Sequence, residues 1–114
     1  GVTILGDGGQ CRDFVFVGDV VRYLLAAMAR LNENGEGADV FNICTGRATT
    51  IQQLVEIIAA AYFHEPKIDH GPVRVGDIYK SLGDPSRLQN TFGFAAETKL
   101  SEGLAATLMR PVRE

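Results

Sequence analysis

Residues 6–20 read GDGGQCRDFVFVGDV, and the neighbouring elements are arranged around this stretch. The four turn residues from Gly6 to Gly9 predict a loop. The apolar run at 14–17 has no polar interruption, so it predicts a buried strand. Gly18 ends this strand, and Asp19 is a suitable N-cap for the helix that follows.

Two helices and a second strand are predicted next. Apolar residues recur at helical spacing over 20–31, which predicts a helix of about four turns with one apolar face. Residues 40–44, VFNIC, repeat the pattern of a buried strand. Thr49 or Thr50 can cap a second amphipathic helix over 51–62.

The last part of the chain combines irregular segments with two further helices. Residues 67–84 contain several Gly and Pro residues and predict strand fragments and turns. Asp84 and Pro85 predict the start of a short helix, with Pro at its first helical position, and Gly93 breaks it. A last amphipathic helix is predicted over 98–110. This order predicts an α+β (α/β-like) fold, in which short strands pack with about four helices in one small mixed domain.

The composition fits one domain over residues 1–114. A hydrophobic share of 46% and a net charge of −3 are typical of a soluble globular protein and exclude a disordered chain. No apolar run approaches the ~20 residues of a membrane-spanning helix, and the weak acidic balance points to neither nucleic acid nor membrane as a partner. Cys11 and Cys44 are interpreted as reduced thiols of a cytoplasmic protein. The opening Gly1, where an initiator Met is expected, suggests a piece of something longer.

Two arginine segments are candidate anion sites, and each also has a plainer interpretation. Arg12 stands between a glycine loop and a predicted strand, where a guanidinium suits a phosphate or a carboxylate. It could equally form a surface pair with Asp13 that contributes little. Arg74 and Asp77 lie three residues apart around a glycine. They could clamp a phosphate and a hydroxyl together, or form only a salt bridge within a turn.

The sequence gives no support for other chemistries. It has no CxxC or HxxxH spacing, so no metal site is predicted, and the isolated His64 and His70 are interpreted as solvent-facing or locally bonded. The loop at 6–11 begins like a dinucleotide-binding fingerprint, but Cys11 stands where the third glycine belongs, and the loop precedes a strand instead of opening a helix. We therefore interpret it as a turn, and we assign no catalytic, cofactor-binding or metal-binding residue.

Five segments together resemble one family, the extended short-chain dehydrogenases that act as NAD-dependent nucleotide-sugar epimerases and dehydratases, such as UDP-glucose 4-epimerase. The stretch at 6–20 is similar to the family pattern GdGxQxRDFvyVdDv. The other four follow in the family's order: FNICTG at 41–46, TIQQL at 50–54, RVGDIYKSLGD at 74–84, and FGF at 92–94 with TKLSEGL at 98–104. The set is specific for the superfamily and less specific for the reaction.

The resemblance covers only the C-terminal part of such an enzyme. The family's N-terminal Rossmann half holds NAD and a Tyr-x-x-x-Lys catalytic pair, and no lysine stands four residues after Tyr23, Tyr62 or Tyr79. The resemblance therefore implies the nucleotide-sugar-binding portion of an epimerase, inactive alone, with NAD bound by the full-length enzyme and not by this chain. The partners that it implies are a nucleotide sugar, above all a UDP-sugar, and the enzyme's own Rossmann domain. A piece without that domain is expected to self-associate.

The resemblance also implies four substrate-binding residues. Arg12 and Arg74 would contact the diphosphate of the nucleotide sugar, Asp77 its ribose and, as in some members, Asn42 the diphosphate. We expect the two guanidiniums to converge on one concave face, with Asp77 beside Arg74. The alternatives are a dehydratase, decarboxylase or reductase acting on the same ligands, or a non-catalytic sugar-nucleotide-binding module.

Overall fold

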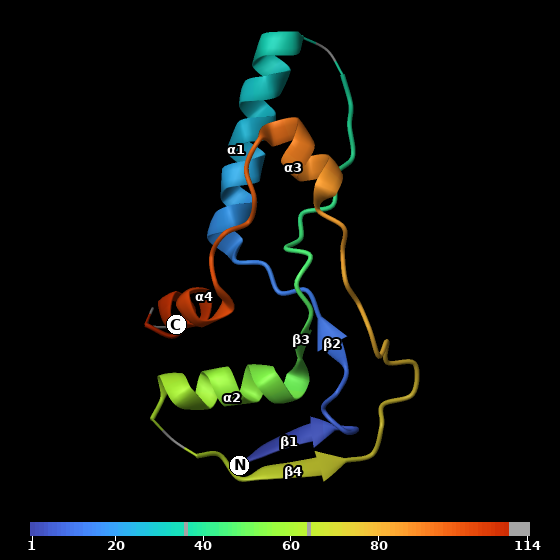
Figure 1. Cartoon of the computed structure of the whole chain (residues 1–114), viewed down its shortest axis with the longest axis vertical. Helices are drawn as coiled ribbons and strands as arrows, with labels where there is room; N and C mark the ends of the chain where they lie inside the picture. Colours follow the sequence, from blue (N-terminus) through green and yellow to red (C-terminus); the bar gives the residue numbers. More distant parts are fainter. Residues whose placement is uncertain (36, 64, 110–114) are drawn as a thin grey trace, which may run out of the picture.

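The computed structural model describes residues 1–35, 37–63 and 65–109 and is elongated, with principal extents of 54 × 33 × 26 Å. Figure 1 shows α1 and α3 in the upper half and the strands with α2 and α4 in the lower half. The helices are α1 (Val17–Asn34), α2 (Ile51–Ala61), α3 (Ser86–Phe92) and α4 (Leu100–Leu108); the strands are β1 (Val2–Leu5), β2 (Cys11–Arg12), β3 (Thr49–Thr50) and β4 (Ile68–Gly71). These four helices and four short strands of the described chain confirm the predicted mixed α+β class.

A strand of two residues, β2, lies at the centre of the lower half. It pairs antiparallel with β3, with Cys11 opposite Thr50. On its other side, the Cys11 N–H donates to the Tyr79 carbonyl at 2.8 Å and the Cys11 carbonyl accepts from the Ser81 N–H at 3.1 Å. β2 therefore has a hydrogen-bonded neighbour on each side, whereas β1 and β4 form a separate parallel pair below it (Figure 1).

The strands predicted at 14–17 and 40–44 are wrong. Neither segment is paired in a sheet within the described chain, and Val17 instead begins α1. Their side chains are nonetheless partly buried, since Val15 and Phe41 both pack against the core. An apolar run reports the burial of side chains, whereas a strand also needs a neighbouring backbone with which to pair.

Helix ends follow the sequence more closely. Thr50 caps α2 through a capping box: its hydroxyl accepts from the Gln53 N–H at 3.1 Å, and the Gln53 side chain accepts from the Thr50 N–H at 2.9 Å. Gly93 ends α3 in the left-handed region, at φ 76°. The prediction for Asp19 is wrong, because this residue lies inside the first turn of α1. Its carboxylate is buried and accepts from the Thr98 N–H at 3.1 Å, so it ties α1 to the segment before α4.

The remaining helix boundaries shift by one to three residues. α3 begins at Ser86, and Pro85 is its N-cap instead of its first helical residue. α4 is shorter than the predicted 98–110, and its last predicted residue lies outside the described residues, as does His64. None of the helices in the described ranges is long and apolar enough to cross a bilayer.

The buried core lies between α1 and α3. Tyr23, Leu88 and Ala96 are each at most 6% exposed. The Tyr23 ring stacks on the Phe94 ring with centroids 4.3 Å apart, and the Tyr23 hydroxyl donates to the Phe94 carbonyl at 2.8 Å. Tyr23 thus joins α1 to the segment that follows α3 by both an aromatic contact and a hydrogen bond.

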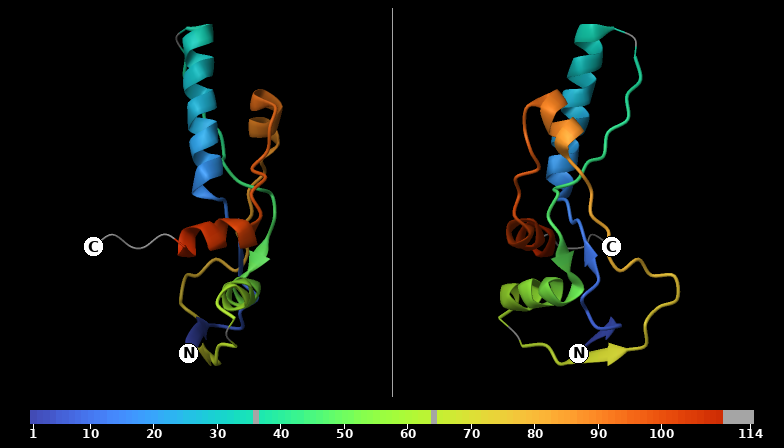
Figure 2. Two further views of the ribbon diagram at one scale, coloured as in Figure 1. Left: turned by 90° about the vertical axis from the view of Figure 1, so that its left-hand side faces the viewer. Right: turned by 45° about the vertical axis from the view of Figure 1, so that its right-hand side comes forward.

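The apolar face predicted for α1 points away from this core. Of the predicted face, Val20 is half-buried and the other five residues are exposed. Together with Val17 they form an exposed row at helical spacing, which we call the α1 stripe: Val17, Val21, Leu24, Leu25, Met28 and Leu31. Figure 2 shows α1 standing largely free along its length. The helix is confirmed, but the face that the described chain buries is the one with Asp19 and Tyr23.

Replacing Tyr23 with Phe keeps the ring stack and removes one buried hydrogen bond. We expect the free energy of unfolding to fall by about 1–2 kcal/mol, because the Phe94 carbonyl loses its partner inside the protein. Urea unfolding checks this, with Tyr62→Phe as the control because Tyr62 lies exposed at the end of α2. If Tyr23→Phe lowers the free energy of unfolding no more than Tyr62→Phe does, the Tyr23 hydroxyl contributes no stability through its hydrogen bond.

Candidate functional site

Arg12 lies at the end of β2 and contacts a distant segment. Its Nη2 donates to Asp77 Oδ1 at 2.7 Å, forming an ion pair between residues 65 positions apart in the sequence. Its Nη1 donates to the carbonyls of Cys11 and Ile78. Both side chains of the pair are about one-third exposed, at 30% and 32%. The guanidinium is therefore held in place at the surface without being closed off from solvent.

Arg74 and Asp77 belong to one tight turn. The Asp77 N–H donates to the Arg74 carbonyl at 3.2 Å, and Gly76 between them takes a φ of 82°, a value that favours glycine. The Arg74 side chain is exposed. The structure thus brings Arg12 and Asp77 into direct contact, and the backbone of Arg74 into the same turn as Asp77.

Asn42 comes from another part of the chain. It is exposed on the unpaired segment between α1 and β3, and in the described residues its side chain makes no hydrogen bond to the other three predicted site residues. Its segment continues into a turn at Thr45 and Gly46, where Gly46 has a φ of 73°. This turn is the point at which the Asn42 segment reaches β2.

Asp13 makes that connection, whereas the sequence suggested it only as a surface partner of Arg12. Its carboxylate accepts from the Thr45 N–H at 2.9 Å, the Thr45 hydroxyl at 2.6 Å and the Gly46 N–H at 2.8 Å. The alternative of an Arg12–Asp13 surface pair is wrong, because the described ion pair of Arg12 is with Asp77. Burial raises the pKa of Asp13, but hydrogen bonds from Thr45, Gly46 and Gly83 lower it by more, so the pKa lies below its usual value.

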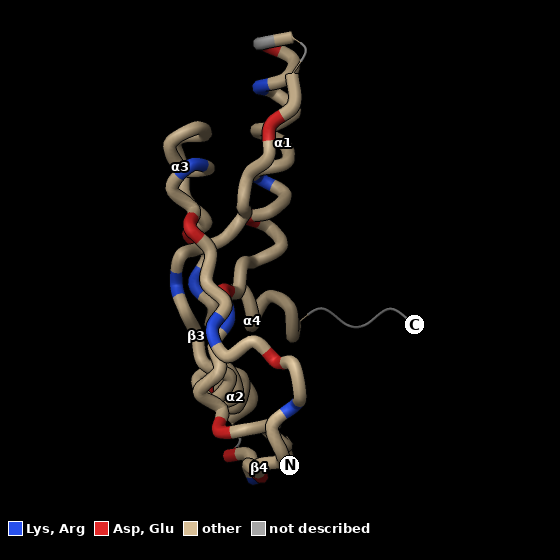
Figure 3. The backbone as a smooth tube through the Cα atoms, turned by 90° about the vertical axis from the view of Figure 1, so that its right-hand side faces the viewer, with Lys and Arg blue, Asp and Glu red and all other residues tan. Residues whose placement is uncertain are grey.

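A hollow of about 160 Å³ lies beside the Arg12–Asp77 pair. It is lined by Leu5, Gly6, Asp7, Gln10, Val73, Asp77 and Tyr79. The Tyr79 hydroxyl donates to Asp7 at 3.2 Å, and the negative charge of Asp7 raises the pKa of Tyr79. Buried Gln10 donates to the Leu5 carbonyl at 2.7 Å. In the view of Figure 3, several basic positions fall near β3, while acidic ones occur both above and below it.

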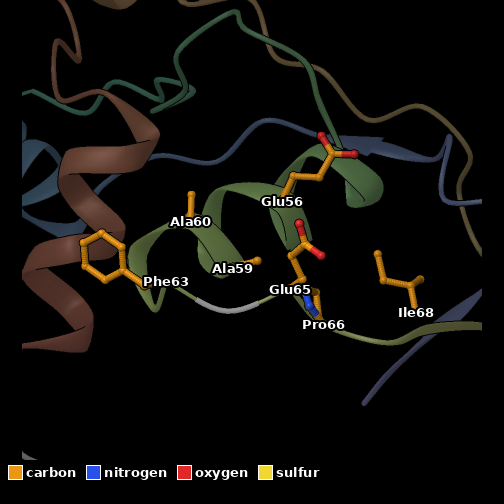
Figure 4. A pocket seen from close by; sticks show the side chains of 7 residues that line it. All are labelled: Glu56, Ala59, Ala60, Phe63, Glu65, Pro66 and Ile68. Atoms are coloured by element: carbon orange, nitrogen blue, oxygen red, sulfur yellow. The ribbon is translucent and has the colours of Figure 1, made fainter.

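A larger hollow near the end of α2 is a poorer candidate for an anion. It measures about 430 Å³ and is lined mainly by apolar side chains, as Figure 4 shows. Its charged groups are the carboxylates of Glu56 and Glu65, which would repel a phosphate. The smaller hollow also has two carboxylates in its lining, those of Asp7 and Asp77. Asp77 is ion-paired with Arg12, however, so a guanidinium lies beside this hollow, and we take it as the candidate site.

The loop at 6–9 does not form a dinucleotide site. It follows β1, but it leads into β2 and not into a helix. The N–H groups of Ile51 and Gln52 at the start of α2 donate to the carbonyls of Gln10 and Gly8, both at 3.0 Å. These contacts leave no strand–turn–helix cradle for a pyrophosphate in this part of the described chain.

Comparison with known proteins shows the family to which the chain belongs. Residues 1–107 match the family model described as GDP-mannose 4,6 dehydratase. The chain belongs to this family, whose members here are NAD-dependent extended short-chain dehydrogenases acting as nucleotide-sugar epimerases and dehydratases.

Individual relatives are mostly epimerases. The chain is 35% identical to a UDP-glucose 4-epimerase of Mycolicibacterium smegmatis, over 92% of this chain and 32% of the relative. It resembles the structure of Thermotoga maritima UDP-glucose 4-epimerase with UDP-glucose at a TM-score of 0.82 and 38% identity, over 94% of this chain and 33% of that one. The Thermus thermophilus UDP-glucose 4-epimerase complex with NAD gives 0.79 and 28%, over 94% and 34%. The chain thus spans about a third of the length of these relatives.

The depressed pKa of Asp13 predicts a specific pH dependence. Its ionised form contributes stability that is fully present above the ordinary value of 3.8 and is lost as the pH falls through the lower folded-state value. Wild type should therefore exceed Asp13→Asn in unfolding free energy at neutral pH, and the difference should shrink at acid pH. Urea unfolding across the acid range measures it. A difference that stays constant or grows on acidification would contradict the assignment.

Proposed function

We propose that this chain is the nucleotide-sugar-binding portion of an NAD-dependent nucleoside-diphosphate-sugar epimerase that resembles UDP-glucose 4-epimerase, with a UDP-sugar as its ligand. The observation that carries the proposal is the contact between Arg12 and Asp77, with Arg74 in the same turn, beside a hollow on the protein surface. The Thermotoga maritima relative, solved with UDP-glucose, supports the choice of ligand.

The charges of the site suit a diphosphate. Arg12, Arg74 and Asp77 together carry one net positive charge at neutral pH. Arg12 uses three of its five N–H donors on Cys11, Ile78 and Asp77, so its Nε–H and one Nη2–H remain for a phosphate oxygen. The free Asp77 oxygen can accept from a ribose hydroxyl while the ion pair stays intact. Asn42 adds a neutral donor from the unpaired segment between α1 and β3.

NAD would be held by the rest of a longer enzyme. The glycine loop of this chain joins two strands, and it lacks the strand–turn–helix geometry that binds a pyrophosphate. When bound in such an enzyme, NAD would supply transient hydride transfer at the sugar. This chain's residues would bind and orient the nucleotide end of the substrate, and alone it is expected to show no turnover. A reductase acting on the same ligand class is the second candidate, because the chain is also 33% identical to a GDP-6-deoxy-D-mannose reductase.

The α1 stripe would form the surface toward the missing Rossmann half. The chain exposes 8425 Å² and has a radius of gyration of 17.3 Å. A compact protein of this mass exposes about 6100 Å² and has a radius of about 13 Å. The excess, about 2300 Å², exceeds the roughly 800 Å² that each partner contributes to a standard interface. A permanent contact within one longer protein accounts for a surface of this size.

Replacing Arg12 or Arg74 with Ala should weaken the binding of UDP-glucose by about 1.5–3 kcal/mol, the range for hydrogen bonds to charged groups. Calorimetric titration of the chain measures this, and titration with NAD should give no binding. Arg30→Ala is the matched control, because Arg30 lies near the far end of α1 and pairs with Asp39 at 3.8 Å. Unchanged affinity in both site variants would refute the proposed site.

Without its partner half, the chain should self-associate through the α1 stripe. Sedimentation velocity at rising concentration should show dimers or larger species, and Leu24→Gln with Met28→Gln should return the chain to a monomer, since Gln is a good helix former. The control pair is Val73→Gln with Val75→Gln, two exposed apolar residues of a loop. A wild-type chain that stays monomeric throughout would contradict the interpretation of the stripe.

A further inference from the structure

We propose that Asp13 is a positioning residue of the nucleotide-sugar site: its carboxylate holds the segment that carries Asn42 against the strand that carries Arg12. This inference rests on the proposed function and adds to it a residue that need not touch the ligand itself.

The contacts of Asp13 join segments that lie far apart in the sequence. Thr45 and Gly46, which donate hydrogen bonds to its two carboxylate oxygens, are 32 and 33 residues away. The Thr45 hydroxyl donates to Asp13 and also accepts from the Arg47 N–H at 3.0 Å, so the carboxylate fixes the whole turn. The turn is tightly packed on its other side as well, since a Cβ at Gly46 would lie 3.2 Å from Pro85.

In the part of the chain that the structure describes, no other group links the Asn42 segment to residues 11–13 by hydrogen bonds. All hydrogen bonds there between residues 40–46 and residues 11–13 end on the Asp13 carboxylate. The next connection to β2 is the pairing with β3 at Thr49, seven residues beyond Asn42. The Asn42 segment has no strand partner in the described chain. Its neighbours Phe41 and Ile43 pack against the core, and the Asp13 carboxylate supplies its hydrogen bonds to the residues around Arg12.

The side chains of the adjacent residues Arg12 and Asp13 contact different segments of the chain. Successive side chains of an extended backbone point to opposite sides. Arg12 contacts Asp77 and Ile78, whereas Asp13 contacts the turn after Asn42. Two adjacent residues thus fix the two segments that supply the other proposed ligand contacts.

A double-mutant cycle separates this role from general stabilisation. UDP-glucose is titrated into wild type, Asp13→Asn, Asn42→Ala and the double variant, at a temperature at which circular dichroism shows each to be folded. Each single change should weaken binding by about fivefold to tenfold, the effect of one lost hydrogen bond. If Asp13 acts through Asn42, the double variant should bind no more weakly than the weaker single variant.

Two further variants and one ligand-free measurement sharpen the result. Asp84→Asn is the matched control, because Asp84 accepts a similar N–H and hydroxyl pair from Ser86, at 2.9 and 2.6 Å, but only two residues away. It should bind as wild type does. Thr45→Val removes the hydroxyl, which donates to Asp13 and accepts from the Arg47 N–H, and keeps the two backbone N–H bonds to Asp13. It should reproduce part of the Asp13→Asn effect if the latter variant folds poorly. Amide exchange at Thr45 and Gly46 should be faster in Asp13→Asn than in wild type.

The possible failures are distinguishable. Unaffected binding in Asp13→Asn, losses that multiply in the double variant, or unchanged amide exchange would each overturn this inference while leaving the proposed function in place. A wild-type chain that does not bind UDP-glucose would overturn the proposed function, and this inference with it.

Discussion

The two-residue strand β2 is the constraint on which the lower half of the molecule depends. It is bonded to β3 on one edge and to the segment around Tyr79 and Ser81 on the other. At its end, Arg12 and Asp13 extend these links through their side chains, one to Asp77 and one to Thr45. Backbone pairing and side-chain bonds therefore converge on three consecutive residues, and the candidate site is assembled around them.

In the upper half, by contrast, the described chain covers only one face of α1. Tyr23 and Asp19 anchor the inner face of α1, while the α1 stripe lies open. The apolar face of an amphipathic helix is normally buried, whereas the described chain leaves the α1 stripe uncovered. The elongated shape and the threefold greater length of the relatives both support the proposal that this chain is the nucleotide-sugar-binding part of a larger protein.

Local interactions could be predicted from the sequence, and long-range ones could not. The Thr50 cap of α2 and the Gly93 end of α3 depend on residues a few positions apart, and both were predicted. The strands at 14–17 and 40–44 were wrong, because an apolar run does not specify a pairing partner. The Arg12–Asp77 contact joins two of the predicted site residues, but spacing alone gave no reason to pair Arg12 with Asp77 instead of Asp13. The resemblance supplied the candidate site residues, and only the three-dimensional structure revealed the contacts of Asp13 with Thr45 and Gly46.

The central claim is that this third of the enzyme binds the nucleotide sugar at the junction around β2. The most direct measurement is a titration of the isotopically labelled chain with UDP-glucose, followed by amide chemical shifts in nuclear magnetic resonance spectra. The account predicts shifts that saturate together at residues 74–79, 11–13 and 42–46 and spare α2. Saturable shifts confined to the hollow near Glu56 and Glu65, or none at all, would contradict it.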